Sequence, residues 1–92
     1  MTQNQQINAG PPREVEEALA RVERLLDAHA GDLDEPGRAR RDLADVREEA
    51  DSDDPDTERM EGALTRLGRR VTGVAVLAEA VHALGTAIGV GG

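Results

Sequence analysis

The chain has 92 residues, which is the length of a single domain. It contains no cysteine, Phe, Tyr or Trp, so disulfides are excluded and the core must consist of aliphatic side chains and methionine. The formal net charge of −8 disfavours nucleic acid and anionic membranes as electrostatic partners. A monomer with so little core material is expected to be marginally stable, so further copies or another protein are expected to complete it.

Residues 1–12 form a polar tail by composition, with four amide side chains before Ile7 and then Gly10 and two prolines. Such a segment is expected to be disordered. The alternative is that residues 3–8 add as an extended strand in an assembly. No positive segment followed by an apolar one opens the chain, so a cytoplasmic location is expected.

The first helix is expected over residues 12–30, where Pro12 suits the first turn and Gly31 provides a stop. Apolar side chains recur at spacings of three and four and predict one buried stripe. The stripe consists of Val15, Ala18, Leu19, Val22, Leu25 and Leu26, with His29 at its end.

The second helix is expected over residues 35–51, with Asp34 as its N-cap. Its apolar stripe is thin, and its other faces are charged. The stripe consists of Ala39, Leu43, Val46 and Ala50. This helix is therefore expected to bury only a narrow seam.

The third helix is expected over residues 55–89, with Asp54 as N-cap and Pro55 at its first position. Apolar residues then alternate spacings of four and three without a slip, as in a coiled coil. They are Met60, Leu64, Leu67, Val71, Val74, Ala78, Val81, Gly85 and Ile88. Beyond Arg70 the segment is apolar on nearly all its faces.

The predicted helix lengths leave part of the third helix uncovered. At about 1.5 Å per residue it spans roughly 50 Å, whereas each of the first two spans roughly 26 Å. Either the third helix breaks near Thr72 and Gly73 and folds back, or another chain covers its C-terminal half. A sharp reversal of the chain normally needs more turn-forming residues than one glycine after one threonine. This favours the continuous helix.

The predicted fold is therefore an all-α module of three helices with a long C-terminal helix and coiled-coil-like homo-oligomeric packing. The predicted oligomer interface lies on the third helix. It consists of Leu67, Val71, Val74, Leu77, Ala78, Val81, Leu84 and Ile88.

Two arginine clusters interrupt the acidic surface. They are formed by Arg38, Arg40 and Arg41, and by Arg66, Arg69 and Arg70. Both are expected to be solvated helix faces paired with nearby acids rather than binding patches.

Glu79 and His82 have the Glu-x-x-His spacing used in di-iron helical bundles. Such a site needs further carboxylates from facing helices, and the apolar stripes of the first two helices carry none. No hydroxyl lies beside a histidine in a nucleophile turn, and no glycine-rich phosphate loop precedes a helix. The sequence therefore predicts no cofactor, no metal and no catalytic residue. A metal-dependent enzyme is the alternative from another class.

Residues 71–90 are also long enough to span a bilayer. Glu79 and His82 at mid-span oppose insertion, because an ionised group there costs about 2.5–3.5 kcal/mol. A membrane-inserted or membrane-anchored protein is therefore kept as the alternative to an adaptor.

The run from Leu64 to Leu84 resembles the last helix of small uncharacterised α-helical domains of actinobacteria. The resemblance rests on Arg69 and Arg70 leading into the apolar segment from Val74 to Val81. The absence of lysine and the abundance of alanine also fit a GC-rich genome of that kind. Some of these domains accompany effector or conflict-system proteins, so the resemblance implies a non-enzymatic oligomerisation or adaptor role, including in antiphage defence. It carries over no catalytic residue.

Overall fold

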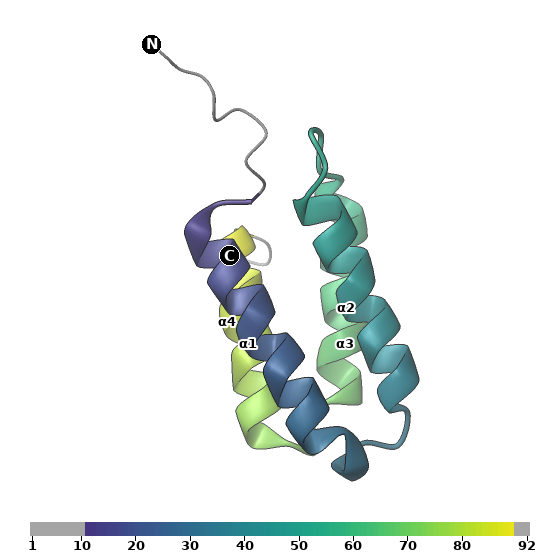
Figure 1. Ribbon diagram of the computed structural model, residues 1–92. Coiled ribbons are helices and arrows are strands. Elements are labelled where there is room, and N and C mark those ends of the chain that lie inside the picture. Colours follow the sequence, from purple (N-terminus) through teal and green to yellow (C-terminus); the bar gives the residue numbers. More distant parts are fainter. Residues whose placement is uncertain (1–10, 90–92) are drawn as a thin grey trace.

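The computed structural model describes residues 11–89, which form four antiparallel α-helices joined by short connections (Figure 1). The helices are α1 (Arg13–His29), α2 (Pro36–Ala50), α3 (Thr57–Arg70) and α4 (Ala75–Ile88), with a 3-10 turn over Ala30–Asp32. The predicted all-α class is confirmed for this range. Of the predicted polar tail, residues 1–10, including the segment 3–8 of the strand alternative, lie outside it.

The bundle consists of two closely packed helix pairs. In Figure 1, α1 lies against α4 on the left, and α2 lies against α3 on the right. The contacts of α1 with α2, and of α3 with α4, are less extensive. Helix α4 therefore returns along the bundle and packs on the first helix of the chain.

The prediction of a third helix over residues 55–89 is wrong, because four residues separate α3 from α4. The Thr72 hydroxyl donates a hydrogen bond to the carbonyl of Arg69 at 3.2 Å, and it satisfies an acceptor that a continuous helix would have used. Val74 is extended, with φ −121° and ψ 99°. The four-helix alternative, with a break near Thr72 and Gly73, is the observed fold.

Apolar burial explains why the chain reverses here. Leu77 and Leu84 of α4 are fully buried against the rest of the bundle. Burying each contributes about 1.5–3 kcal/mol, whereas each helical hydrogen bond lost at the break costs about 1 kcal/mol net. The spacing of four and three continues through the corner, so Val71 and Val81 are both buried as well.

The predicted N-caps of the second and third helices are also wrong. Pro36 is the first residue of α2, so Glu35 rather than Asp34 takes the N-cap position, without a side-chain cap. The N-cap of α3 is Asp56, two residues after the predicted Asp54, and its Oδ1 accepts a hydrogen bond from an α3 backbone N–H at 3.1 Å. The Asp56 N–H in turn donates to Glu49 Oε1 at 2.8 Å, which holds the start of α3 against the end of α2.

Helix α4 has 14 residues and ends at Ile88, followed by the C-cap residue Gly89, whose φ of 96° favours glycine. The continuous apolar helix over residues 71–90 that the membrane alternative requires is therefore not formed within the described part of that segment. No helix between residues 11 and 89 has both the length and the apolarity needed to cross a bilayer.

Candidate interaction surfaces

The eight predicted interface residues lie in or against the core of the chain's own bundle. Five are buried, and these are Leu67, Val71, Leu77, Val81 and Leu84. The other three, Val74, Ala78 and Ile88, are partly buried and pack against that core. Helix α4 folds back and uses these side chains for packing within the chain, and their predicted contact with another chain stays a prediction.

The fold instead exposes the opposite side of α4. We define the α4 outer face as its six exposed residues, Ala75, Val76, Glu79, His82, Ala83 and Thr86. Val76 is the one large hydrophobic side chain exposed among residues 11–89, with 37% of its surface accessible. The α4 outer face is therefore a narrow strip of small and apolar residues with one acid and one histidine at its centre.

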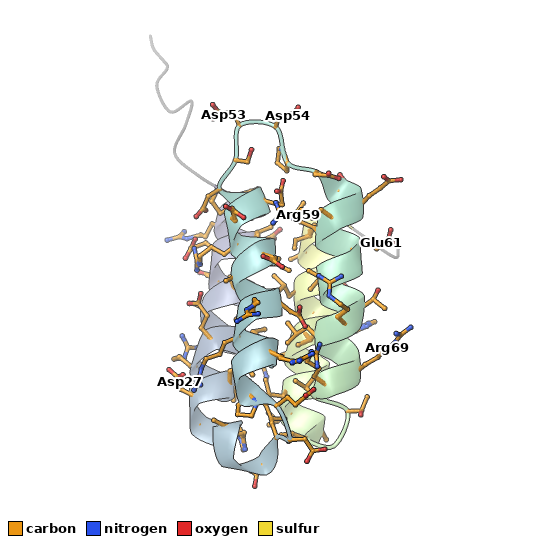
Figure 2. The ribbon with its side chains drawn as sticks, turned by 90° about the vertical axis from the view of Figure 1, so that its right-hand side faces the viewer. Asp27, Asp53, Asp54, Arg59, Glu61 and Arg69 are labelled. Carbon is orange, nitrogen blue, oxygen red and sulfur yellow. The ribbon has the colours of Figure 1, made fainter. Side chains whose placement is uncertain are left out.

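This face differs from the outer faces of the other helices. Charged residues make up seven of the eight exposed residues of α1, four of six in α2 and five of seven in α3, but only one of six in α4. Figure 2 shows charged side chains projecting from the α2 and α3 surfaces, among them Glu61 and Arg69. In a chain with a net charge of −8, the α4 outer face has the fewest charges to desolvate.

Glu79 and His82 lie one turn apart on the α4 outer face and are both exposed. Within residues 11–89, neither side chain has an ion-pair partner, and no group of three or more potential metal ligands occurs. Both polar groups are therefore available to a molecule that approaches this face.

The charged groups of the other helices are mostly committed to one another. Arg47 of α2 reaches across to α1, where its Nε lies 3.0 Å from Glu23 and its Nη2 lies 3.1 Å from Glu16. Hydrogen bonds to Glu16 and then Glu23 raise the pKa of Arg47, and the same Arg47 hydrogen bond lowers the pKa of Glu16. These contacts fasten the thin apolar seam of α2 to α1.

A buried carboxylate fastens α2 to α3. Only 8% of the Asp42 side chain is accessible, and it accepts hydrogen bonds from Arg66 Nε at 3.2 Å and Arg70 Nε at 2.9 Å. Arg70 Nη1 also lies 2.8 Å from Glu35. The hydrogen bond that Arg70 donates to Asp42 is the main cause that raises the pKa of Arg70. The apolar pattern does not indicate this burial, because Asp42 lies beside the apolar seam of α2 rather than on it.

The ion pairs continue along the same seam toward the loop between α2 and α3. Arg59 Nη1 donates to Glu49 Oε2 at 2.6 Å, and Arg59 Nη2 lies 3.3 Å from Glu48 and 3.6 Å from Asp45. The hydrogen bond to Glu49 is the main cause that raises the pKa of Arg59. Acids of α2 and arginines of α3 thus pair along most of the length of the two helices.

Nearby carboxylates partly neutralise the two arginine clusters, in line with the expectation that these arginines pair with acids. Arg38 and Arg40 pair with Glu35 and Asp27. Arg66 and Arg70 share Asp42. Among the described residues, Arg41 and Arg69 have no carboxylate within ion-pair distance. Neither cluster is a concentrated basic patch.

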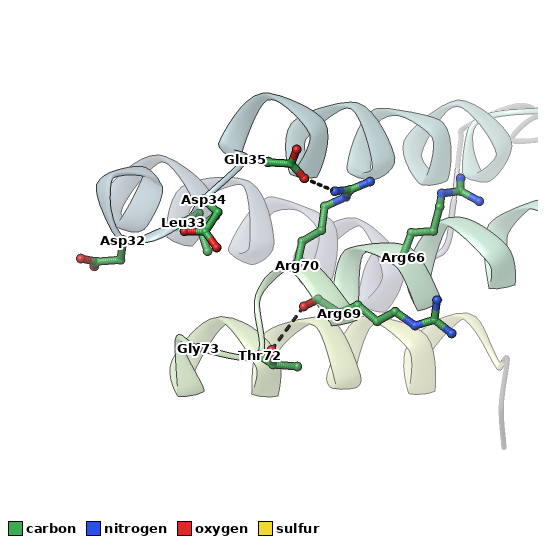
Figure 3. A pocket seen from close by; sticks show the side chains of 9 residues that line it. All are labelled: Asp32, Leu33, Asp34, Glu35, Arg66, Arg69, Arg70, Thr72 and Gly73. Carbon is green, nitrogen blue, oxygen red and sulfur yellow. Dashed lines mark hydrogen bonds and ion pairs between the residues drawn. The ribbon is translucent and has the colours of Figure 1, made fainter.

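A groove of about 650 Å³ lies at the end of the bundle where the chain passes from α1 to α2 and from α3 to α4 (Figure 3). Three acids face three arginines across it, and Arg70 bridges to Glu35. The lining residues are Asp32, Leu33, Asp34, Glu35, Arg66, Arg69, Arg70, Thr72 and Gly73. Its charges balance, and two of its arginines are already held by Asp42, so the groove has no excess charge to attract an ion.

The sequence pattern did not separate α4 from α3, and it did not identify the α4 outer face. The segment beyond Arg70 is apolar on most of its faces, which predicts that another chain surrounds it. Folding back against α1 covers only one side of the segment. The other side stays exposed, and the uncharged residues Ala75, Val76 and Ala83 mark it in the sequence.

A model for a family of unknown function, DUF5955, matches residues 6–92, nearly the whole chain. No curated protein and no solved structure matches it.

Proposed function

The chain belongs to DUF5955, a family of unknown function, and from its own surface we propose that it is a non-enzymatic helical interaction module that binds protein through the α4 outer face. The observation that supports this proposal is the contrast in charge. The outer faces of α1, α2 and α3 are dense with ionised groups, whereas that of α4 carries one acid among six exposed residues. An apolar surface with few charges has the smallest desolvation cost when a partner covers it.

The packing of the bundle fits a binding role. Ion pairs join α2 to both of its neighbours, and the apolar core joins α4 to α1. The α4 outer face is thus presented on a helix whose position is fixed, which reduces the ordering cost of binding. A role in a bacterial conflict or antiphage assembly, an actinobacterial source and a cytoplasmic location are implied by the resemblance and composition discussed above, and they stay predictions.

Photo-crosslinking in cells of the source organism tests this proposal. A photoreactive amino acid replaces Ala83 of the α4 outer face or, as a matched control, Ala44, an exposed alanine of α2. We expect covalent protein adducts from position 83 and few from position 44. Equal yields from the two positions, or adducts from position 44 alone, would contradict binding through α4.

A further inference from the structure

We propose that the partner of the α4 outer face is a second copy of this chain, bound in antiparallel orientation about a two-fold axis. The inference rests on the proposed function and adds the identity of the partner. Its central feature is a reciprocal pair of contacts, in which Glu79 of each copy meets His82 of the other copy.

The spacing of the exposed residues carries this inference. In a two-fold antiparallel helix pair, a residue on one side of the axis faces a residue equally far on its other side. For an axis between residues 80 and 81, Glu79 and His82 are equally distant, and so are Ala75 and Thr86. The polar groups then pair with each other at the centre, and the small residues face each other at the ends.

Charge selects a second copy over a partner of opposite charge. An electropositive protein would be drawn to the acids on the other helices rather than to α4. Two copies that each carry a net charge of −8 repel one another, so they associate most favourably where the charge is least. The α4 outer face is that place, and its own acid and histidine are complementary to each other in this geometry.

The small side chains favour close contact between the two helices. Ala75, Ala83 and Thr86 allow helix axes to approach to the short end of the usual range of about 8–10 Å. A helix of 14 residues is about 21 Å long, so the contact is smaller than the ~1,200 Å² of a standard interface. The dimer is therefore expected to be weak and to dissociate on dilution.

A charge swap tests the reciprocal contact. We compare wild type, Glu79→Arg, His82→Glu and the double variant by sedimentation equilibrium with refractive-index detection, because the chain has no aromatic residue. His82→Glu places two carboxylates opposite each other, and Glu79→Arg leaves His82 facing a cation instead of its hydrogen-bond acceptor. Each single variant should therefore weaken dimerisation about tenfold or more, equivalent to about 1.4 kcal/mol. The double variant restores opposite charges and should recover the wild-type affinity to within about threefold. Circular dichroism checks that all four proteins keep the same helix content, as exposed positions should allow.

Cysteine cross-linking tests the orientation independently of these charges. The natural chain has no cysteine, so introduced thiols are the only ones present. Position 75 of one copy faces position 86 of the other, whereas the two copies of position 75 lie about 16 Å apart along the helices, beyond the ~7 Å limit for a disulfide. An oxidised mixture of Ala75→Cys and Thr86→Cys should therefore form covalent heterodimers, and neither variant should cross-link alone.

Several results would overturn the inference. A wild-type chain that stays monomeric up to about 1 mM, a level at which binding of only about −4 kcal/mol becomes visible, contradicts the dimer. Self-association that is unchanged in both single charge variants contradicts the reciprocal contact, and cross-linking of Ala75→Cys with itself contradicts the antiparallel orientation. A monomer whose position 83 crosslinks to a different protein in cells overturns the second copy but leaves the proposed function standing.

Discussion

Replacing Asp42 by asparagine removes the charge that joins α2 to α3 and changes little else. The asparagine keeps the shape of the side chain, but its neutral carbonyl can accept from one arginine only, and its NH₂ group faces the other. Hydrogen bonds to charged groups contribute about 1.5–3 kcal/mol each, and breaking a fully buried pair costs about 3–5 kcal/mol.

The expected cost of Asp42→Asn lies toward the lower end of these values. The side chains of Arg66 and Arg70 are 49% and 24% accessible, and they keep Asp45 and Glu35 as second partners. We therefore expect a loss of about 2 kcal/mol in the free energy of unfolding, which corresponds to a fall of roughly 8–16 °C in Tm for a domain of this size.

Thermal and urea unfolding followed by far-ultraviolet circular dichroism measure this loss. The matched control is Asp53→Asn in the exposed loop between α2 and α3, where Asp53 has no ion-pair partner among the described residues. The control should change the free energy of unfolding by no more than about 0.5 kcal/mol. An effect of Asp42→Asn no larger than that of the control would refute the reasoning that this buried carboxylate holds the two helices together.

Two further predictions follow from the packing and from the ion pairs. Leu84→Ala removes a fully buried side chain between α4 and the rest of the core and should lower the free energy of unfolding by about 2–5 kcal/mol, measured by chemical denaturation. Thr86→Ala, at an exposed position, should lower it little. Equal losses would show that α4 is not packed as described. Because the hydrogen bond from Arg47 lowers the folded pKa of Glu16 below its ordinary value of 4.5, its stabilising contribution is fully present above that value and is lost as pH falls through the folded pKa. Glu16→Gln should therefore be less stable than wild type at neutral pH and should approach it in acid, as urea titrations at several pH values will show; a difference that does not shrink in acid would contradict this linkage.

The sequence was sufficient to predict the helical class and the buried stripes of the first two helices, because apolar spacing directly reports which face of a helix is buried. The same spacing could not reveal the corner over residues 71–74. Val71, Val74 and Val81 keep their register whether the chain continues or reverses, since both arrangements place them against other helices. The decisive interaction is the burial of Leu77 and Leu84 against α1, which is distant in sequence.

The candidate surface was hidden from the sequence for a related reason. An apolar residue at an exposed position, such as Val76, looks the same in a sequence as one in the core. Only after α4 is seen to pack on α1 can Ala83 and its neighbours be assigned to the outside. The position of Asp42 between two arginines was hidden for the opposite reason, because a charged side chain is normally expected to face solvent.

The return of α4 along the bundle is the central claim, because it both fills the core and creates the α4 outer face. It can be tested by measuring the distance between spin labels on Glu58→Cys and Thr86→Cys, near the start of α3 and the end of α4, by pulsed electron paramagnetic resonance, with unlabelled protein in excess to suppress contacts between copies. The two sites lie at the same end of a bundle whose shorter dimensions are 24 and 22 Å. Adjacent packed helices lie only about 8–10 Å apart, so a distance of no more than about 25 Å between the labels is expected. A continuous helix would separate the labels by about 42 Å at about 1.5 Å per residue, and a distance near that value would contradict the account.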